Sequence, residues 1–309
     1  MTDRLETIAV VVVTYNSAHL LPDLVASLGP GLDGLTWHLA VADNASADES
    51  VKVLREIAPE ARVVEVGRNA GYAAGINAAV AAADAHTAVL VLNPDIRLEP
   101  GCVAEMVAVM RRRGAGIVVP RLSEGDGRFS PSLRREPTIL RALGDALLGA
   151  NRMGHFATLG EVITDQGQYA DEMTVDWAEG SMMLIDRHCW QECGPWDESF
   201  FLYSEETEYA LRARDRGFAT IFAPNARALH LGGESTTSPG LWALLTLNRV
   251  RLYRRRHGRP RTAVYWAVLL LRELSRAALG NRCSRFAARS LLSPTRLREA
   301  PGPLSVRVG

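Results

Sequence analysis

The sequence predicts an α/β fold with a mostly parallel sheet, helices on both of its faces, and a helical appendage at the C-terminus. Short runs of β-branched and apolar residues alternate with longer helical patterns through the first 122 residues. Strands and helices that alternate in this way form parallel sheets through right-handed crossovers. From residue 238 onward only helical patterns follow. The 309 residues therefore divide into three expected parts, 1–122, 123–237 and 238–309, of which the first two form one domain.

The first part contains five expected strands, each an apolar run bounded by turn-forming residues. Ser17 and the pair Ser46–Glu49 are positioned to cap two of the intervening helices. Gly71 suits a helix N-terminus that approaches a phosphate or a base closely. The expected strands cover residues 8–13, 35–42, 62–66, 89–92 and 117–120, and the helices end near residues 28, 57, 83 and 113.

Three of these strands end in polar residues. The run 89–92 continues into Asn93-Pro94-Asp95, and the first two strands end in Thr14-Tyr15-Asn16 and Asp43-Asn44. The carboxyl ends of parallel strands meet at one rim, where open α/β sheets bind ligands. A carboxylate there can hold a divalent cation that also contacts phosphate oxygens. Asp95 alone is more simply explained as a cap of the next loop, so the prediction depends on all three strand ends.

Residues 123–176 lack a regular pattern apart from one expected helix near 138–148, and we expect an irregular insertion over the crevice. The bend 177–181 then precedes an apolar strand at 182–185. Trp177 and Glu179 on this bend are a plausible platform for a sugar, although a tryptophan that packs in the core is the commoner explanation.

A second dense stretch places Glu205, Glu206 and Glu208 at the start of an expected helix. The helix dipole favours acidic residues there, which is the simpler structural explanation. Three carboxylates in four residues also repel one another, which raises the pKa of at least one and suits a general base. His230 is by itself most simply structural, but beside an acid and a phosphate it becomes a candidate metal ligand.

Bulk composition counts against several classes of protein. The net charge is zero, so no overall field indicates nucleic-acid binding. The glycine loop at 67–71 does not read GxGxxG, which counts against a dinucleotide-dependent oxidoreductase. The four cysteines are scattered, the N-terminus has no signal-peptide pattern, and no apolar run reaches the ~18 residues of a membrane span. A cytoplasmic protein in a reducing compartment is expected.

The C-terminal region combines arginines with aromatic residues. Residues 249–261 contain seven arginines, and an expected helix over 262–278 carries Tyr265 and Trp266. This composition favours a peripheral helix on an anionic membrane surface, which would be the inner face of the plasma membrane. A solvated helix pair that caps the domain is the alternative. The oligomeric state is left open.

Taken together, these residues resemble family 2 inverting glycosyltransferases of the GT-A fold, especially bacterial rhamnosyltransferase-like members. The resemblance covers roughly residues 8–235, and the tail lies outside it. It rests on the strand ends described above and on further motifs. These are Asn69-Ala70-Gly71 with Asn77, Gly180-Ser181, Glu205-Glu206-Thr207-Glu208, Leu211 with Arg214 and Gly217, and His230 with Ser235.

The resemblance implies that residues 1–122 bind a nucleotide sugar and residues 123–237 bind the acceptor and carry catalysis. It implies a single displacement in which Glu206, or its neighbour Glu205, removes the acceptor proton. It also implies a divalent cation, Mg²⁺ or Mn²⁺, held by Asp95 and His230. A dTDP-rhamnose donor and a glycan or polyprenyl-linked acceptor of cell-wall or surface polysaccharide synthesis are expected. The implied nucleotide-sugar residues are Thr14, Tyr15, Asn16, Asp43, Asn69, Gly71, Asn77, Asn93 and Asp95, and the implied acceptor residues are Trp177, Glu179, Gly180 and Ser181.

Two departures from the family pattern keep other functions open. Asn93 stands where the metal motif has its first acid, and the usual Glu-Asp-x-Asp is Glu205-Glu206-x-Glu208. A glutamate at position 206 reaches one methylene further than an aspartate but still accepts a proton. The alternatives are a sugar-nucleotide-binding protein without catalytic activity and another kind of nucleotide-dependent enzyme.

Overall fold

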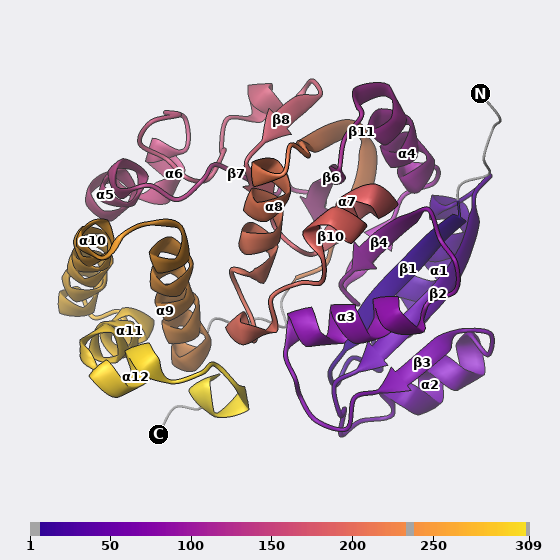
Figure 1. Ribbon diagram of the computed structural model, residues 1–309, viewed down its shortest axis with the longest axis horizontal. Helices are drawn as coiled ribbons and strands as arrows, with labels where there is room; N and C mark the ends of the chain where they lie inside the picture. The colour runs from indigo at the N-terminus through magenta and orange to yellow at the C-terminus, as the bar shows by residue number, and fades with distance from the viewer. Residues whose placement is uncertain (1–6, 233–237, 307–309) are drawn as a thin grey trace.

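The computed structural model describes residues 7–232 and 238–306. Its centre is a nine-stranded sheet in the order β3-β2-β1-β4-β10-β6-β11-β5, with β8 also pairing to β11. The sheet and its helices form one body, and the C-terminal helices form a second body beside it (Figure 1). The expected fold class, an α/β sheet with a C-terminal helical region, is confirmed.

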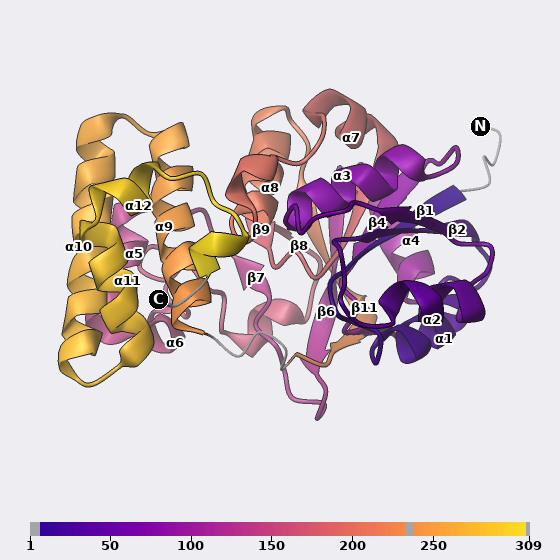
Figure 2. The ribbon, with the colours of Figure 1, turned by 90° about the horizontal axis from the view of Figure 1, so that it is seen from below.

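The N-terminal half of the sheet is parallel, as expected. β1 pairs in parallel with both β2 and β4, and β2 pairs with β3. Helices cover both faces of the sheet, with α3 on one face and α1 and α2 on the other (Figure 2). Because both faces of the sheet are buried, the central strands are apolar throughout and do not alternate between apolar and polar residues. The elements are β1 (Thr7–Thr14), α1 (Leu21–Gly31), β2 (Thr36–Asp43), α2 (Ser50–Ile57), β3 (Arg62–Glu65), α3 (Tyr72–Ala82), β4 (Ala88–Leu92) and α4 (Cys102–Arg113).

The second half of the sheet is mixed. β10 lies antiparallel between β4 and β6, whereas β11 runs parallel to β6 and antiparallel to β5. As a result the start of β10 meets the end of β4 at the rim. The elements are β5 (Ile96–Leu98), β6 (Ile117–Glu124), β8 (Met173–Val175), β10 (Met182–Asp186), α7 (Arg187–Cys193), α8 (Glu205–Asp215) and β11 (Thr220–His230), with a small separate sheet of β7 (Leu133–Arg134) and β9 (Trp177–Ala178).

The irregular insertion joins the C-terminal helices through its own helix, α5. Thr138 caps α5, and the apolar side of α5 packs against the C-terminal helices in a separate core cluster. This helix therefore belongs to the C-terminal body rather than to a cover over the crevice. The remaining helices are α5 (Ile139–Leu148), α6 (Ala150–Met153), α9 (Pro239–Arg256), α10 (Arg259–Ala278), α11 (Arg282–Leu292) and α12 (Pro294–Arg298).

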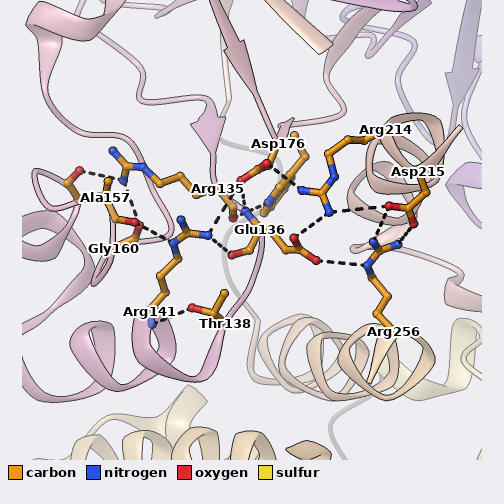
Figure 3. A network of polar contacts seen from close by, with 12 residues as sticks. Arg135, Glu136, Thr138, Arg141, Ala157, Gly160, Asp176, Arg214, Asp215 and Arg256 are labelled. Atoms are coloured by element: carbon orange, nitrogen blue, oxygen red, sulfur yellow. Dashed lines mark hydrogen bonds and ion pairs between the residues drawn. The ribbon is translucent and has the colours of Figure 1, made fainter. Parts of the chain in front are cut away.

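A polar network connects the two bodies (Figure 3). Arg214 of α8 donates to Asp176 at 2.9 Å and to Glu136 at 2.8 Å. Glu136 also accepts from Arg256 of α9, which in turn pairs with Asp215 at 2.8 Å. The insertion, the helix α8 and the helix α9 are therefore held at one point by charge-assisted hydrogen bonds.

Several local expectations are wrong. The helix α1 begins at Leu21 without a side-chain cap from Ser17. The capping box is also absent, because the Glu49 side chain makes no capping hydrogen bond to α2 and Ser46 bonds to Asp43 instead. Strand β5 was not expected, since three residues after a turn give too short a pattern to recognise.

Part of the expected basic face of the tail is used inside the protein, while Arg254, Arg259 and Arg261 remain exposed. Arg249 pairs with Glu161, Arg255 with Asp197 and Arg256 with Glu136, so these arginines hold the protein together. Tyr265 is fully buried and stacks on Tyr253, with ring centroids 4.0 Å apart. Among the described residues, we find no helix both long enough and apolar enough to cross a bilayer.

Candidate active site

The rim of the sheet brings the first two strand ends together. Thr14 and Asp43 are register partners, and the buried Thr14 hydroxyl donates to Asp43 at 2.9 Å. Asp43 also accepts from the backbone N–H of Ser46 at 2.9 Å. Asn16 has a left-handed backbone (φ 56°), and its side-chain oxygen accepts from Ala47 at 2.7 Å. These hydrogen bonds hold Thr14, Asn16 and Asp43 together as a polar surface, called the shelf below. The side chain of Tyr15 beside it is half exposed.

The glycine loop lies against the loop that precedes α8. Gly71 has φ of +95°, and a Cβ added there would lie 2.3 Å from the carbonyl oxygen of Phe201. The N–H of Tyr72 donates to that same oxygen at 2.8 Å. Asn69 accepts from the Gly71 N–H at 3.2 Å, and Asn44 donates to the Gly71 carbonyl at 3.0 Å. Gly71 is thus required by close backbone approach.

Asn77 lies on α3 and has a different role from the other predicted nucleotide-sugar residues. Its side-chain amide donates to the carbonyl of Trp196 and to Glu198, both at 2.9 Å, and its oxygen accepts from the Trp196 N–H at 2.9 Å. All three contacts tie α3 to the segment before α8. We therefore assign Asn77 to this structural contact and not to the nucleotide sugar.

Asp95 and His230 meet at the rim as expected. The nitrogen Nε2 of His230 lies 3.2 Å from Oδ2 of Asp95. Burial lowers the pKa of His230, but the contact with Asp95 outweighs burial and leaves that pKa above its ordinary value. The other oxygen, Oδ1 of Asp95, is buried and has no hydrogen-bond partner in the described residues. An unpaired buried carboxylate oxygen beside an imidazole fits a divalent cation.

The described residues contain no group of three or more His, Cys, Asp or Glu side chains arranged around a metal site. A cation at Asp95 and His230 would therefore take its other ligands from a diphosphate and water, as Mg²⁺ sites commonly do. The backbone N–H of Asn93, the residue at the first position of the metal motif, donates to the carbonyl of Ser181 at 2.8 Å. Ser235 of the predicted motif lies outside the described residues.

Glu205 and Glu206 begin α8 but differ in environment. Glu205 is buried, and burial together with Glu206 raises its pKa well above the ordinary value. Glu206 is half buried, and burial raises its pKa to about 7, with Glu179 adding to the effect and Arg134 opposing it. Glu208 instead pairs with Arg212 at 2.9 Å one turn along the helix. Glu206 is thus the carboxylate of this motif with a pKa poised near neutrality.

Tyr72 connects the acids at the rim. Its hydroxyl donates to the Gly180 carbonyl at 2.9 Å. Burial raises the pKa of Tyr72 well above its ordinary value, and the charges of Glu205, Asp95 and Glu206 raise it further. Gly180 also lies against Glu206, and the carbonyl of the next residue, Ser181, accepts from the N–H of Asn93 two residues before Asp95, so the metal candidate and the base candidate belong to one site.

The loop before α8 is strained and is held from the C-terminal body. Phe201, Tyr203 and Ser204 all have left-handed backbones, with φ of 64°, 70° and 75°. Such conformations are costly for residues other than glycine and concentrate at functional sites. The buried amide of Asn248 on α9 donates to the carbonyls of Phe200, Leu202 and Tyr203 at 2.8, 2.8 and 3.1 Å.

The predicted acceptor residues lie in β9 and in the bend that follows it, beside α8. A Cβ added to Gly180 would lie 3.0 Å from the Cβ of Glu206, so Gly180 lets Glu206 lie against the backbone. Ser181 has a buried hydroxyl without a partner in the described residues. Glu179 pairs with Arg134. Trp177 is only 9% exposed and donates to the Arg135 carbonyl at 3.0 Å, so the expectation of a sugar platform there is wrong.

Comparisons with known proteins identify the family. The model described as "Glycosyl transferase family 2" matches residues 9–163, and that of "Glycosyl transferase family group 2" matches residues 88–259. The N-acetylglucosaminyl-diphospho-decaprenol L-rhamnosyltransferase of Mycobacterium tuberculosis is 30% identical over 76% of this chain and 78% of that protein. The chain belongs to glycosyl transferase family 2. A low-salt glycan biosynthesis hexosyltransferase of Haloferax volcanii, Agl10, is 27% identical over 68% of this chain and 62% of that protein.

Solved structures agree with the fold of this family 2 glycosyltransferase. A mannosyltransferase from Pyrobaculum calidifontis, in complex with GDP-Man and Mn²⁺, superimposes with a TM-score of 0.58 at 15% identity and covers 97% of this chain and 77% of that chain. S. aureus TarS residues 1–349 superimpose with a TM-score of 0.54 at 14% identity and cover 94% and 82%. The fold is the GT-A fold. The chain is thus a glycosyltransferase that uses a nucleotide sugar, and the binding-protein and other-enzyme alternatives are not supported.

Sequence reasoning missed three residues of the site. Tyr72 follows the glycine loop directly and is a tyrosine in an alanine-rich helix, a signal that was available. Arg134 lies in the irregular insertion, where no periodicity marks it. Asn248 is a polar residue among the apolar positions of α9, and a buried asparagine within a helix usually has partners to satisfy.

Proposed function

We propose that this family 2 glycosyltransferase transfers rhamnose from dTDP-rhamnose to a polyprenyl-diphosphate-linked sugar by an inverting displacement. The rhamnosyl group and the polyprenyl-diphosphate-linked acceptor follow the name of the mycobacterial relative, which is 30% identical. The dTDP form of the donor is the one implied by the resemblance to rhamnosyltransferase-like members of the family. The inverting step rests on one observation of this chain: Glu206, half buried against Gly180, has a pKa raised to about 7. A carboxylate with that pKa is suited to accept a proton at neutral pH.

In the proposed reaction Glu206 takes the proton of the acceptor hydroxyl as its oxygen attacks the anomeric carbon. The new C–O bond forms on one face of the sugar, and the bond to the diphosphate breaks on the other, so the electron pair leaves with the nucleoside diphosphate. The shelf of Thr14, Asn16 and Asp43 would bind the nucleoside. Held by Asp95 and His230, a divalent cation would neutralise charge on the diphosphate.

The protein incubated with nucleotide sugars and acceptors tests this proposal. dTDP-rhamnose, dTDP-glucose, UDP-N-acetylglucosamine and GDP-mannose are offered with and without a polyprenyl-diphospho-N-acetylglucosamine acceptor. We expect release of nucleoside diphosphate only from dTDP-rhamnose, dependent on the acceptor, and a product with inverted anomeric configuration by NMR. Turnover with another donor would overturn the rhamnose assignment, and a retained configuration would overturn the role of Glu206.

A further inference from the structure

The helix α10 exposes apolar side chains and buries charged ones. Val264, Leu271 and Leu274 are 50%, 54% and 46% exposed. Glu273 is fully buried, where it accepts from Trp242 at 2.8 Å and pairs with Arg272. Tyr265, Val268 and Leu269 are buried as well, so the helix carries apolar residues on both its buried and its exposed face, whereas an ordinary surface helix turns a polar face to water. The exposed apolar stripe consists of Ala263, Val264, Ala267, Leu271, Leu274 and Ala278.

Exposed arginines lie beside this stripe. α11, which packs against α10, exposes Arg282, Arg285 and Arg289 at helical spacing, and none of the three forms an ion pair with a carboxylate in the described residues. On the other side, α5 exposes Leu147 and Leu148. α10 lies at the edge of the molecule between α5 and α11 (Figure 1).

The sequence of this surface is almost free of acid. Residues 257–298 contain nine arginines and one acidic residue, the buried Glu273. A second copy of the chain docked here would bring arginines near arginines with no exposed carboxylate between them to offset their repulsion. A nucleic acid would leave the apolar stripe of α10 without a partner. A bilayer with anionic headgroups satisfies both features, because it offers phosphates beside an apolar interior.

We propose that α10 and α11 dock on the anionic surface of a phospholipid bilayer. The apolar stripe of α10 enters the headgroup boundary, and Arg282, Arg285 and Arg289 lie near the lipid phosphates. This surface shares α10 with the one expected from the sequence, but Tyr265 is buried and Arg249 and Arg256 pair inside the protein, so the basic residues next to the stripe are those of α11. The biological purpose rests on the proposed function, because a polyprenyl-linked acceptor resides in a bilayer, but docking itself needs no substrate.

Co-sedimentation of the full chain with vesicles tests the proposal. Phosphatidylglycerol–phosphatidylcholine vesicles are compared with phosphatidylcholine alone, at low and high salt. The variants are Leu271→Gln with Leu274→Gln, and Arg282→Gln with Arg285→Gln and Arg289→Gln. A matched control replaces Arg55, Arg62 and Arg128, exposed arginines outside this surface, with Gln. Donor binding by each variant confirms that it is folded.

We expect the wild-type protein to bind anionic vesicles at low salt and to be released by high salt. The arginine variant should lose affinity on the order of 10²-fold, since each basic residue near an anionic surface strengthens binding several-fold. The leucine variant should also be released, and the control should bind as the wild type does. A wild-type protein that stays in the supernatant, or an equal loss in the control, overturns the proposal.

A different result would identify a second copy as the partner. If the wild-type protein is a dimer and the leucine variant is a monomer, with no vesicle binding by either, α10 is an interface between copies and the proposal is wrong. Vesicle binding with no transfer from any donor would contradict only the proposed function.

Discussion

The base candidate depends on three neighbouring residues. Gly180 allows the side chain of Glu206 to lie against the backbone, Arg134 favours its charged form, and Glu179 disfavours it. The pKa of about 7 results from burial and from these opposed charges. Glu206 is thus poised to gain or lose a proton near neutral pH.

Replacing Glu206 with Gln should leave donor binding intact and lower transfer by about 10²-fold or more, because the amide cannot accept a proton. In the wild-type protein Glu206 is protonated below its pKa and works only when ionised. The rate of transfer at low substrate should therefore rise as pH rises through about 7. Stopped assays across pH measure both effects. Glu205→Gln is the control, and a larger loss there would show that Glu205 is the base.

Gly180→Ala tests the position of Glu206 without changing a charge. The added Cβ would lie 3.0 Å from the Cβ of Glu206 and 3.4 Å from its Cγ, so the glutamate must shift. We expect kcat to fall at least tenfold, since small displacements of a catalytic group are costly. Donor affinity should be unchanged in calorimetry. Wild-type kcat in this variant would show that Glu206 tolerates the shift and is not placed by Gly180.

At the scale of elements, the loop 201–204 is the critical connection. Its three left-handed residues direct the chain into α8, and it is held on one side by Tyr72 and on the other by Asn248. Through Asn248, α9 therefore holds the loop that leads into α8. Asn248 itself contacts none of the predicted binding residues. The C-terminal body is part of the catalytic apparatus by position.

Asn248→Ala should release this loop. Three carbonyls would lose their hydrogen-bond donor, which we expect to lower the free energy of unfolding by about 1–3 kcal/mol. We also expect kcat to fall more than the affinity for the nucleotide sugar. Asn281→Ala is a matched control, because it removes the cap of α11 at a cost of about 1 kcal/mol far from the loop. Chemical denaturation and kinetics of folded protein report both. If the two variants have equal kcat, Asn248 does not position the loop.

Sequence alone could predict elements whose burial is two-sided, such as β1 and β4, because their apolar runs are unbroken. That Asp95 and His230 would meet was implied by the resemblance to the family, and the two side chains do lie together at the rim. Sequence alone could not predict that β10 enters the sheet antiparallel, which depends on long-range pairing. Arg134 was missed for a similar reason, because the contacts of an irregular segment have no periodic pattern in sequence.

At the scale of the whole molecule, buried charge joins the bodies. Arg249 of α9 pairs with Glu161 of the insertion, which is 5% exposed. Buried pairs of this kind add little stability compared with an apolar pair, but breaking one side is costly. The arrangement of the C-terminal helices relative to the sheet therefore depends on complete pairs.

Arg249→Gln should lower the free energy of unfolding by about 3–5 kcal/mol, because Glu161 would be left charged and buried. Arg254→Gln changes an exposed arginine on the same helix and should shift stability by less than about 0.5 kcal/mol. The double variant Arg249→Met with Glu161→Leu should recover much of the loss. Denaturant titrations measure all three, and an equal effect of both single changes would refute the buried pair as the cause.

The contact between Gly71 and Phe201 has a consequence for how this protein can evolve or be engineered. Any side chain at position 71 would collide with the carbonyl of Phe201, so the two loops cannot vary independently. A lineage could accept a substitution at position 71 only after the loop before α8 had already moved. Efforts to change donor preference should therefore begin at Tyr15 and Asn16, whose hydrogen bonds go to Ser17 and Ala47 and not to either of these two loops.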